Sequence, residues 1–384
     1  MTSLTAAEFP QPSTEALAVS AELAKRVGAL IDSAGGWIRF DQYMDQALYA
    51  PGLGYYSAGS TKFGGDGDFV TAPELGSFLA RALAGQFAEL LATLDAPVIM
   101  ELGAGSGKLA EQLLDALAEF GLAEIPYRIL ETSADLRARQ QQLLQRFGDR
   151  VQWPARLPDS QFEGVLVANE VADALPVVRF VKRAGQAVPI GVARHEQGFG
   201  WVLGAEDDAL TEAVASLEHK LGEPLADDYR SEICLLLPAW IDSLAATVSR
   251  GALLLIDYGL VRREYYHSQR RDGTLICHYR HRAHDDPFYL PGLQDISAWV
   301  DFSACADAAQ RAGLEVSGFT TQGLYLAASS TLMHSVTQSL DQQALSALKT
   351  LMLPGEMGER FKLLLLTKRC ESLRLPGRDF RNRL

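Results

Sequence analysis

Hydrophobic positions follow a helical period in the first part of the chain and change to short apolar runs after about residue 97. Residues 16–35, 40–49 and 75–94 place apolar side chains three or four positions apart, which predicts three amphipathic helices. Residues 49–74, between the second and third of them, are rich in Gly and Tyr and predict a loop. A loop of this length inside a compact protein usually carries function.

The rest of the chain alternates strand patterns with helix patterns. A strand is predicted from residue 97 into a glycine turn, and further strands are predicted at 127–131, 151–153, 163–169, 251–259, 318–326 and 361–368. Helices are predicted at 108–120, 134–146, 303–313 and 341–353. This order is typical of an α/β fold in which helices cover both faces of a parallel sheet.

Two segments interrupt the alternation. Residues 177–203 are punctuated by glycines and predict a β-ribbon, and residues 207–249 have a mostly helical pattern, so we expect an insertion at about 177–250. A long polar loop is expected at 260–294. The predicted domains are therefore an N-terminal helical segment at 1–94 and an α/β core at 95–384.

Composition restricts the partners. The net charge of −13 disfavours a nucleic-acid partner, because the protein's field repels phosphate backbones. The same charge is compatible with a basic partner, or with solubility alone. No apolar run approaches the roughly 18 residues of a membrane span, so none is predicted.

The cysteines and the N-terminus indicate the compartment. The four cysteines form no C-x-x-C pair, which favours a reducing environment over a disulfide framework. The first 20 residues contain Glu8 and Glu15 but no arginine, and no basic segment precedes an apolar one. Neither a secretory signal nor a transit peptide is predicted, so we expect a bacterial cytoplasmic protein.

A glycine loop at residues 101–107 gives the strongest local signal, since it follows an apolar run and opens a helix. Glycines let a ligand approach the backbone, and the helix start offers unpaired N–H groups. The dinucleotide fingerprint needs a third glycine where this chain has Lys108, and an acid about 20 residues on. Here the acid is Glu131, 28 residues after Gly103, and Glu101 precedes the loop. A strand-to-helix turn without a ligand and a nicotinamide-cofactor site remain alternative interpretations of this loop. The arrangement resembles the first motif of Rossmann-like methyltransferases.

The strand at 163–169 ends in Asn169, Glu170 and, after two more residues, Asp173. Ligands of open α/β sheets bind beyond the carboxyl ends of the strands, where the strand order reverses. Two carboxylates at that point fit a substrate with a cationic nitrogen, such as a guanidinium. They would orient it by forked hydrogen bonds and accept its proton. Alternatively, Asp173 caps a turn before Pro176, and only Asn169 and Glu170 face the pocket.

Three histidines in the polar loop at 260–294 are candidates for a metal site. His278, His281 and His284 match no known ligand spacing, and Arg280 and Arg282 between them would repel a cation. No metal site is predicted.

Together these stretches resemble the MidA-type methyltransferases. The resemblance spans roughly residues 35–368 and rests on segments at 43–56, 63–76, 101–109, 130–133, 167–180, 254–259, 273–287, 292–302 and 357–366. The chain departs from the family pattern at Ala172, Ser297 and Trp299, where the family usually has leucine or phenylalanine, threonine and histidine.

The resemblance implies a class I methyltransferase sheet, with residues 1–94 as a tail and helical cap over the active site. It implies S-adenosyl-L-methionine as the cofactor, held by Glu101, Gly103, Ala104, Gly105, Gly107, Glu131, Thr132, Ser133 and Asn169. Phe69 and Thr71 are expected on a loop near the ligand, and Glu170 and Asp173 are expected to be catalytic.

The family includes a mitochondrial respiratory complex I assembly factor that methylates an arginine. The expected function is therefore methylation of an arginine on a partner protein, with complex I subunits as first candidates. A non-catalytic assembly factor and a small-molecule methyltransferase are the alternatives. The intact glycine loop and carboxylates favour an enzyme.

Overall fold

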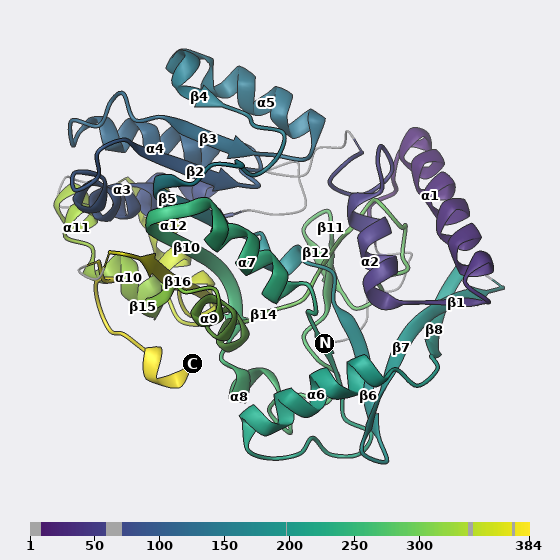
Figure 1. Ribbon diagram of the computed structural model, residues 1–384. Helices are drawn as coiled ribbons and strands as arrows, with labels where there is room; N and C mark the ends of the chain where they lie inside the picture. The colour runs from purple at the N-terminus through teal and green to yellow at the C-terminus, as the bar shows by residue number, and fades with distance from the viewer. Residues whose placement is uncertain (1–8, 59–70, 197, 337–340, 371–372) are drawn as a thin grey trace. The chain divides into compact units, whose positions relative to one another are not determined.

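The structure is a computed structural model that describes residues 9–58, 71–196, 198–336, 341–370 and 373–384. Its tertiary contacts divide the chain into two units (Figure 1). The first unit comprises residues 9–58, Asp173–Leu237 and Leu260–Trp299, and the second comprises residues 71–172, Pro238–Gly259 and Val300–Leu384.

The second unit is built on an eight-stranded sheet. Its strands are β2 (Pro97–Leu102), β3 (Tyr127–Leu130), β4 (Val151–Gln152), β5 (Phe162–Asn169), β10 (Val248–Leu260), β14 (Val300–Asp301), β15 (Glu315–Thr321) and β16 (Phe361–Lys368). Its α-helices are α3 (Phe78–Leu91), α4 (Lys108–Ala118), α5 (Ala134–Leu144), α7 (Leu237–Thr247), α9 (Phe302–Arg311), α10 (Gln322–Ala328), α11 (Ser330–Val336), α12 (Gln342–Met352) and α13 (Met357–Arg360). Short 3₁₀ turns are η2 (Ala72–Leu75), η3 (Gln145–Arg150), η4 (Ala172–Ala174) and η5 (Arg381–Arg383).

The strand order of this sheet is β15-β16-β10-β5-β2-β3-β4, with β14 paired to β10. The chain runs outward from β2 through β3 to β4 and then returns to β5 on the other side of β2 (Figure 1). The strand order therefore reverses between β2 and β5, and the ends of these strands carry the glycine loop and Asn169. The predicted α/β, Rossmann-like fold is confirmed.

The prediction of a parallel sheet was wrong in one respect. The pairs β2–β3, β3–β4, β2–β5 and β5–β10 are parallel, whereas β16 runs antiparallel to both β10 and β15. The apolar run of β16 gives no sign of its direction, because a strand buried on both faces has the same composition either way.

Both faces of the sheet are covered. Val165 and Val167 of β5 join the core formed with α3 and α4, and Leu166, which points to the opposite face, is also fully buried. The central strands thus have no polar face, which explains their continuous apolar sequences.

Gly164 fixes the spacing of the central strands. It has φ of +146°, and a Cβ built there would lie 1.9 Å from the Val98 carbonyl oxygen of β2. We expect Gly164→Ala to lower the free energy of unfolding by about 3 kcal/mol or more, since the backbone of a parallel sheet cannot yield locally. Urea denaturation followed by circular dichroism measures this loss.

Gly121→Ala is the matched control. Gly121 also has positive φ, +77°, but a Cβ there meets nothing within 4 Å. It should cost only the backbone strain of about 1–2 kcal/mol. Equal losses for the two variants would contradict the steric explanation.

The first unit contains two smaller sheets. Its strands are β1 (Trp37–Arg39), β6 (Val178–Arg183), β7 (Gln186–His195), β8 (Gly198–Leu203), β9 (Arg230–Ile233), β11 (Ile276–Tyr279), β12 (Arg282–His284) and β13 (Asp295–Ser297). Its helices are α1 (Thr14–Ser33), α2 (Phe40–Tyr49), α6 (Asp208–Leu221) and α8 (Arg262–Tyr265). Strands β1, β6, β8 and β9 form one sheet with β7, and β11 lies between β12 and β13 in the other.

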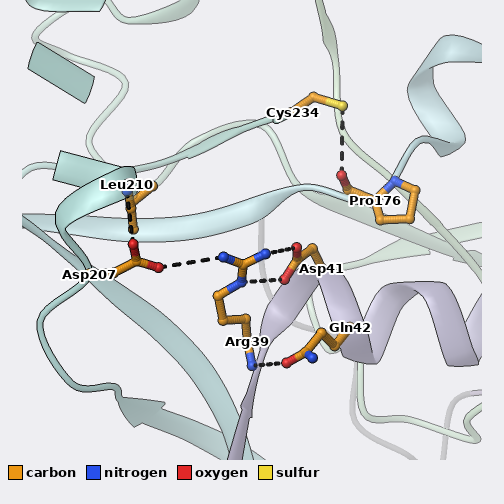
Figure 2. A network of polar contacts seen from close by, with 7 residues as sticks. All are labelled: Arg39, Asp41, Gln42, Pro176, Asp207, Leu210 and Cys234. Carbon is orange, nitrogen blue, oxygen red and sulfur yellow. Dashed lines mark hydrogen bonds and ion pairs between the residues drawn. The ribbon is translucent and has the colours of Figure 1, made fainter. Parts of the chain in front are cut away.

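Polar contacts tie the N-terminal segment to the inserted ribbon (Figure 2). The Arg39 guanidinium forms ion pairs with Asp41, at 2.6 Å, and with Asp207, at 3.4 Å. Asp207 also caps α6, because its Oδ1 accepts a hydrogen bond from the Leu210 N–H. In addition, β1 pairs with β7 over residues 37–39.

The contacts therefore group the N-terminal helices with the insertion. This division differs from the predicted boundary near residue 94, since η2 and α3 belong to the unit with the glycine loop. The polar loop predicted at 260–294 contains α8, β11 and β12, and the segment predicted as strand 318–326 changes to helix α10 after Thr321. Strands β1 and β9 were also missed. Among the described helices, none is long and apolar enough to cross a membrane.

Candidate functional site

The glycine loop connects β2 to α4 with three glycines in left-handed backbone conformation. Gly103, Gly105 and Gly107 have φ of +58°, +56° and +82°. The Gly103 N–H donates to the Leu130 carbonyl at the end of β3, and Gly107 is the N-cap of α4. Gly103 and Gly105 are thus fixed in a turn that side chains disfavour, and Gly103 is exposed.

Glu131 follows β3 and is 5% exposed. Its Oε1 accepts a hydrogen bond from the Ser133 N–H at 2.9 Å. Its Oε2 accepts a hydrogen bond from Nε2 of Gln140 at 3.0 Å. The same Gln140 nitrogen donates to the Gly105 carbonyl at 2.9 Å. Gln140, on α5, therefore links the glycine loop to Glu131, a carboxylate that the sequence predicted as a cofactor ligand.

Sequence reasoning missed Gln140. It is fully buried, and its Oε1 accepts the indole N–H of Trp153 at 3.0 Å. A Cβ on Gly107 would lie 3.2 Å from its Cγ, so a glycine there lets Gln140 pack against the start of α4. A glutamine on the buried face of an otherwise polar helix was the available signal.

Glu101, the penultimate residue of β2, has a buried carboxyl group. Its Oε2 accepts a hydrogen bond from the Tyr127 hydroxyl at 2.6 Å, and the residue is 2% exposed. Burial raises the pKa of Glu101 to about 7, the Tyr127 hydrogen bond lowers it, and the charge of Glu131 raises it. Below about pH 7 the protonated form of Glu101 is therefore favoured in the folded protein.

This carboxyl group should make stability depend on pH. Because the pKa is raised from 4.5 to about 7, the unfolded state releases its proton first, and stability falls as pH rises between these values. We expect the free energy of unfolding to drop by about 3 kcal/mol at most between pH 5 and pH 8 from this group. Glu101→Gln, which keeps an acceptor for Tyr127, should remove that drop. Parallel pH profiles for the two proteins would contradict the prediction.

Asn169 ends β5, and Glu170 follows it near the glycine loop. Glu170 has φ of +55°, a strained conformation for a residue with a side chain. Its Oε1 accepts a hydrogen bond from Nδ2 of Asn169 at 3.3 Å. Among the described residues, Asn169 Oδ1 is buried without a hydrogen-bond partner. The next residue, Val171, lies close to the glycine loop, since a Cβ on Gly103 would lie 3.3 Å from its Cγ2.

The chemistry of this corner is that of an acceptor site. A buried acceptor without a donor is costly unless a ligand supplies one. A carboxylate beside it adds further acceptor capacity and can take up a proton. The pair suits a ligand that brings N–H groups and positive charge.

The turn before α3 is anchored to the glycine loop and to α4. Ser106, in the glycine loop, donates a short hydrogen bond to Glu74, and Gln112 of α4 donates to the Pro73 carbonyl at 2.8 Å. Thr71, half-buried, immediately precedes this turn. Phe69 lies outside the described residues.

The other residues predicted to bind the cofactor or to be catalytic differ in their exposure and contacts. Ala104 is buried within the glycine loop. Thr132 is exposed after Glu131, whereas the Ser133 side chain caps α5 by accepting the Leu136 N–H. Asp173 belongs to the first unit, where it is 7% exposed and its carbonyl accepts the Ala298 N–H.

Two tyrosines and a histidine outside the predicted site have structural contacts or a buried position in the first unit. The Tyr49 hydroxyl donates to the Ala174 carbonyl, and the Tyr56 hydroxyl donates to Asp295. Burial lowers the pKa of His278 to about 4. In the described part of the chain, no three His, Cys, Asp or Glu side chains form a group that could hold a metal.

Comparisons with known proteins identify the fold and the cofactor. A family model described as "Putative S-adenosyl-L-methionine-dependent methyltransferase" matches residues 80–320. A crystal structure of a "likely methyl transferase" from Burkholderia thailandensis, bound to S-adenosyl-homocysteine, is 40% identical, with a TM-score of 0.90 over 98% of this chain and 100% of that one.

Two relatives from animals are similar over most of their length. The "Protein arginine methyltransferase NDUFAF7 homolog, mitochondrial" of Drosophila melanogaster is 29% identical, over 93% of this chain and 87% of that protein. The mouse "Protein arginine methyltransferase NDUFAF7, mitochondrial" is 27% identical, over 85% of this chain and 80% of that protein. The chain thus belongs to the S-adenosyl-L-methionine-dependent methyltransferase family that its sequence motifs resembled, and S-adenosylmethionine is its cofactor.

Proposed function

We propose that this methyltransferase modifies an arginine side chain of a partner protein, and that Glu170 is its catalytic carboxylate. The observation that carries the proposal is the corner at the end of β5, where the buried acceptor Asn169 Oδ1 adjoins the Glu170 carboxylate. Both groups accept hydrogen bonds, and a guanidinium has only donors to give. The relatives named protein arginine methyltransferases support the same choice.

The residues around the glycine loop fit the cofactor. Bound S-adenosylmethionine supplies an electrophilic methyl group on a sulfonium. We assign Glu131 to the ribose hydroxyls, because each carboxylate oxygen can accept more than one hydrogen bond. The left-handed glycines at 103 and 105 allow a ligand to approach the backbone closely, and Gln140 holds this turn and Glu131 together.

Glu170 has two tasks in the proposed reaction. It orients the guanidinium by charge-assisted hydrogen bonds, and it accepts the proton that the attacking nitrogen loses as the N–CH₃ bond forms. A free guanidinium keeps its proton at neutral pH, so a base at the reacting nitrogen lowers the barrier. Asp173 is retained as a second predicted carboxylate, to be tested as Asp173→Asn.

Charge favours a basic protein segment as the substrate. The net charge of −13 attracts cationic partners over distances of about 10 Å at moderate salt. We extend the proposal to a subunit of respiratory complex I, modified in the bacterial cytoplasm, on the strength of the sequence resemblance.

The test is methyl transfer from labelled S-adenosylmethionine to a set of basic peptides that contain arginine. Mass spectrometry should locate the methyl group on an arginine side chain, and matched peptides with lysine at that position should stay unmodified. Transfer to small amines or phenols but to no peptide would instead support a small-molecule enzyme. Cofactor binding without any transfer would support an assembly factor.

A further inference from the structure

A second carboxylate, Asp257, holds the backbone that carries Glu170. Asp257 lies in β10, directly after the residue that pairs with Asn169 in the parallel register of β10 and β5. It is 2% exposed. Its Oδ2 accepts the N–H groups of Val171, at 3.2 Å, and Ala172, at 2.9 Å.

Strand β10 also binds the backbone of Glu170 itself. The Glu170 N–H donates to the Ile256 carbonyl at 2.8 Å, and Asp257 Oδ1 accepts the Tyr258 N–H at 2.9 Å. Two adjacent residues of β10 thus bind three consecutive N–H groups, those of residues 170, 171 and 172. Such a clamp explains how Glu170 keeps a left-handed conformation that side chains disfavour.

The clamp also sets the distance between two loops. Val171, whose N–H binds Asp257, has its Cγ2 against Gly103 of the glycine loop. Movement of the 170–172 backbone would therefore shift the Glu170 carboxylate relative to the residues assigned to the cofactor. Displacements of about 1 Å at a reacting centre can cost about 100-fold in rate.

We propose that Asp257 is a positioning residue for methyl transfer: it holds the turn at residues 170–172 so that the Glu170 carboxylate stays at the reacting nitrogen. This inference rests on the proposed role of Glu170. In this scheme Asp257 acts through the backbone of residues 171 and 172, whose N–H groups it binds.

The test compares Asp257→Ala and Asp257→Asn in the full chain. Asp257→Ala should lower kcat by about 100-fold, while the dissociation constant of S-adenosylmethionine changes less than about threefold. Asp257→Asn keeps one carbonyl oxygen for the two N–H groups and should restore about tenfold of the lost rate. The control is Asp301→Ala, which removes the cap of α9 in the same unit and should leave kcat unchanged.

Amide hydrogen exchange gives a readout that does not depend on turnover. Val171 and Ala172 should exchange at least about tenfold faster in Asp257→Ala than in the wild type. Unchanged exchange, kcat within twofold of wild type, or a parallel loss of cofactor affinity would each overturn the positioning role. Absence of arginine methylation by the wild-type protein would overturn the proposed function itself, whatever the exchange rates show.

Discussion

Replacing Glu131 by alanine is expected to weaken S-adenosylmethionine binding about 100-fold, measured by isothermal titration. Two charge-assisted hydrogen bonds to ribose hydroxyls contribute about 3 kcal/mol together, and tenfold in affinity corresponds to about 1.4 kcal/mol. Glu131 also orders the turn through Ser133 and Gln140, so a loss of about 100-fold is the smallest that we expect. NAD should bind to neither protein.

The matched control for this prediction is Asp135→Asn. Asp135 is another carboxylate four positions along, but it forms a surface ion pair with Arg139 on α5. Asp135→Asn changes the net charge by the same amount as Glu131→Ala and should leave the affinity for S-adenosylmethionine unchanged. If both variants bind the cofactor as the wild type does, the assignment of Glu131 to the ribose is wrong.

The local sequence pattern predicted those residues of the candidate site that directly follow a strand. The glycine loop, Glu131 and Asn169 each follow an apolar run directly, and the ends of adjacent parallel strands meet at one edge. The rule that ligands bind where the strand order reverses then brings these segments together as one candidate site. The sequence therefore predicted both loops and the carboxylates beside them as the candidate site.

The supporting residues could not be predicted in this way. Gln140 reaches Gly105 across 35 positions of sequence, and Asp257 reaches Val171 across 86. Nothing in the local sequence of either residue indicates which backbone group it binds. The antiparallel direction of β16 and the pairing of β1 with β7 depend in the same way on contacts between distant segments.

The domain prediction shows a related difficulty. The insertion after Pro176 and the segment at 260–294 looked like unrelated interruptions of an α/β pattern. In the structure they share the first unit with α1 and α2, partly because Arg39 binds Asp207 and Tyr43 donates to the Pro287 carbonyl. Pieces of one unit that are separated by strands of another give no local signal of belonging together.

Replacing Glu170 by glutamine is expected to lower kcat about 1,000-fold, within the range for removal of a general base. Glutamine keeps the size and one acceptor oxygen, so the Asn169 contact and the affinity for S-adenosylmethionine should change little. The rate falls because the amide cannot take up the guanidinium's proton.

Glu163→Gln is the control, since it makes the same change at the opposite end of β5. It should leave kcat unchanged. Wild-type turnover by Glu170→Gln would mean that the proton of the guanidinium goes elsewhere, and Asp173→Asn would then be the variant to measure. A parallel loss of cofactor binding would instead make Glu170 part of the cofactor site, because a base that acts only on the substrate affects kcat without the cofactor's dissociation constant.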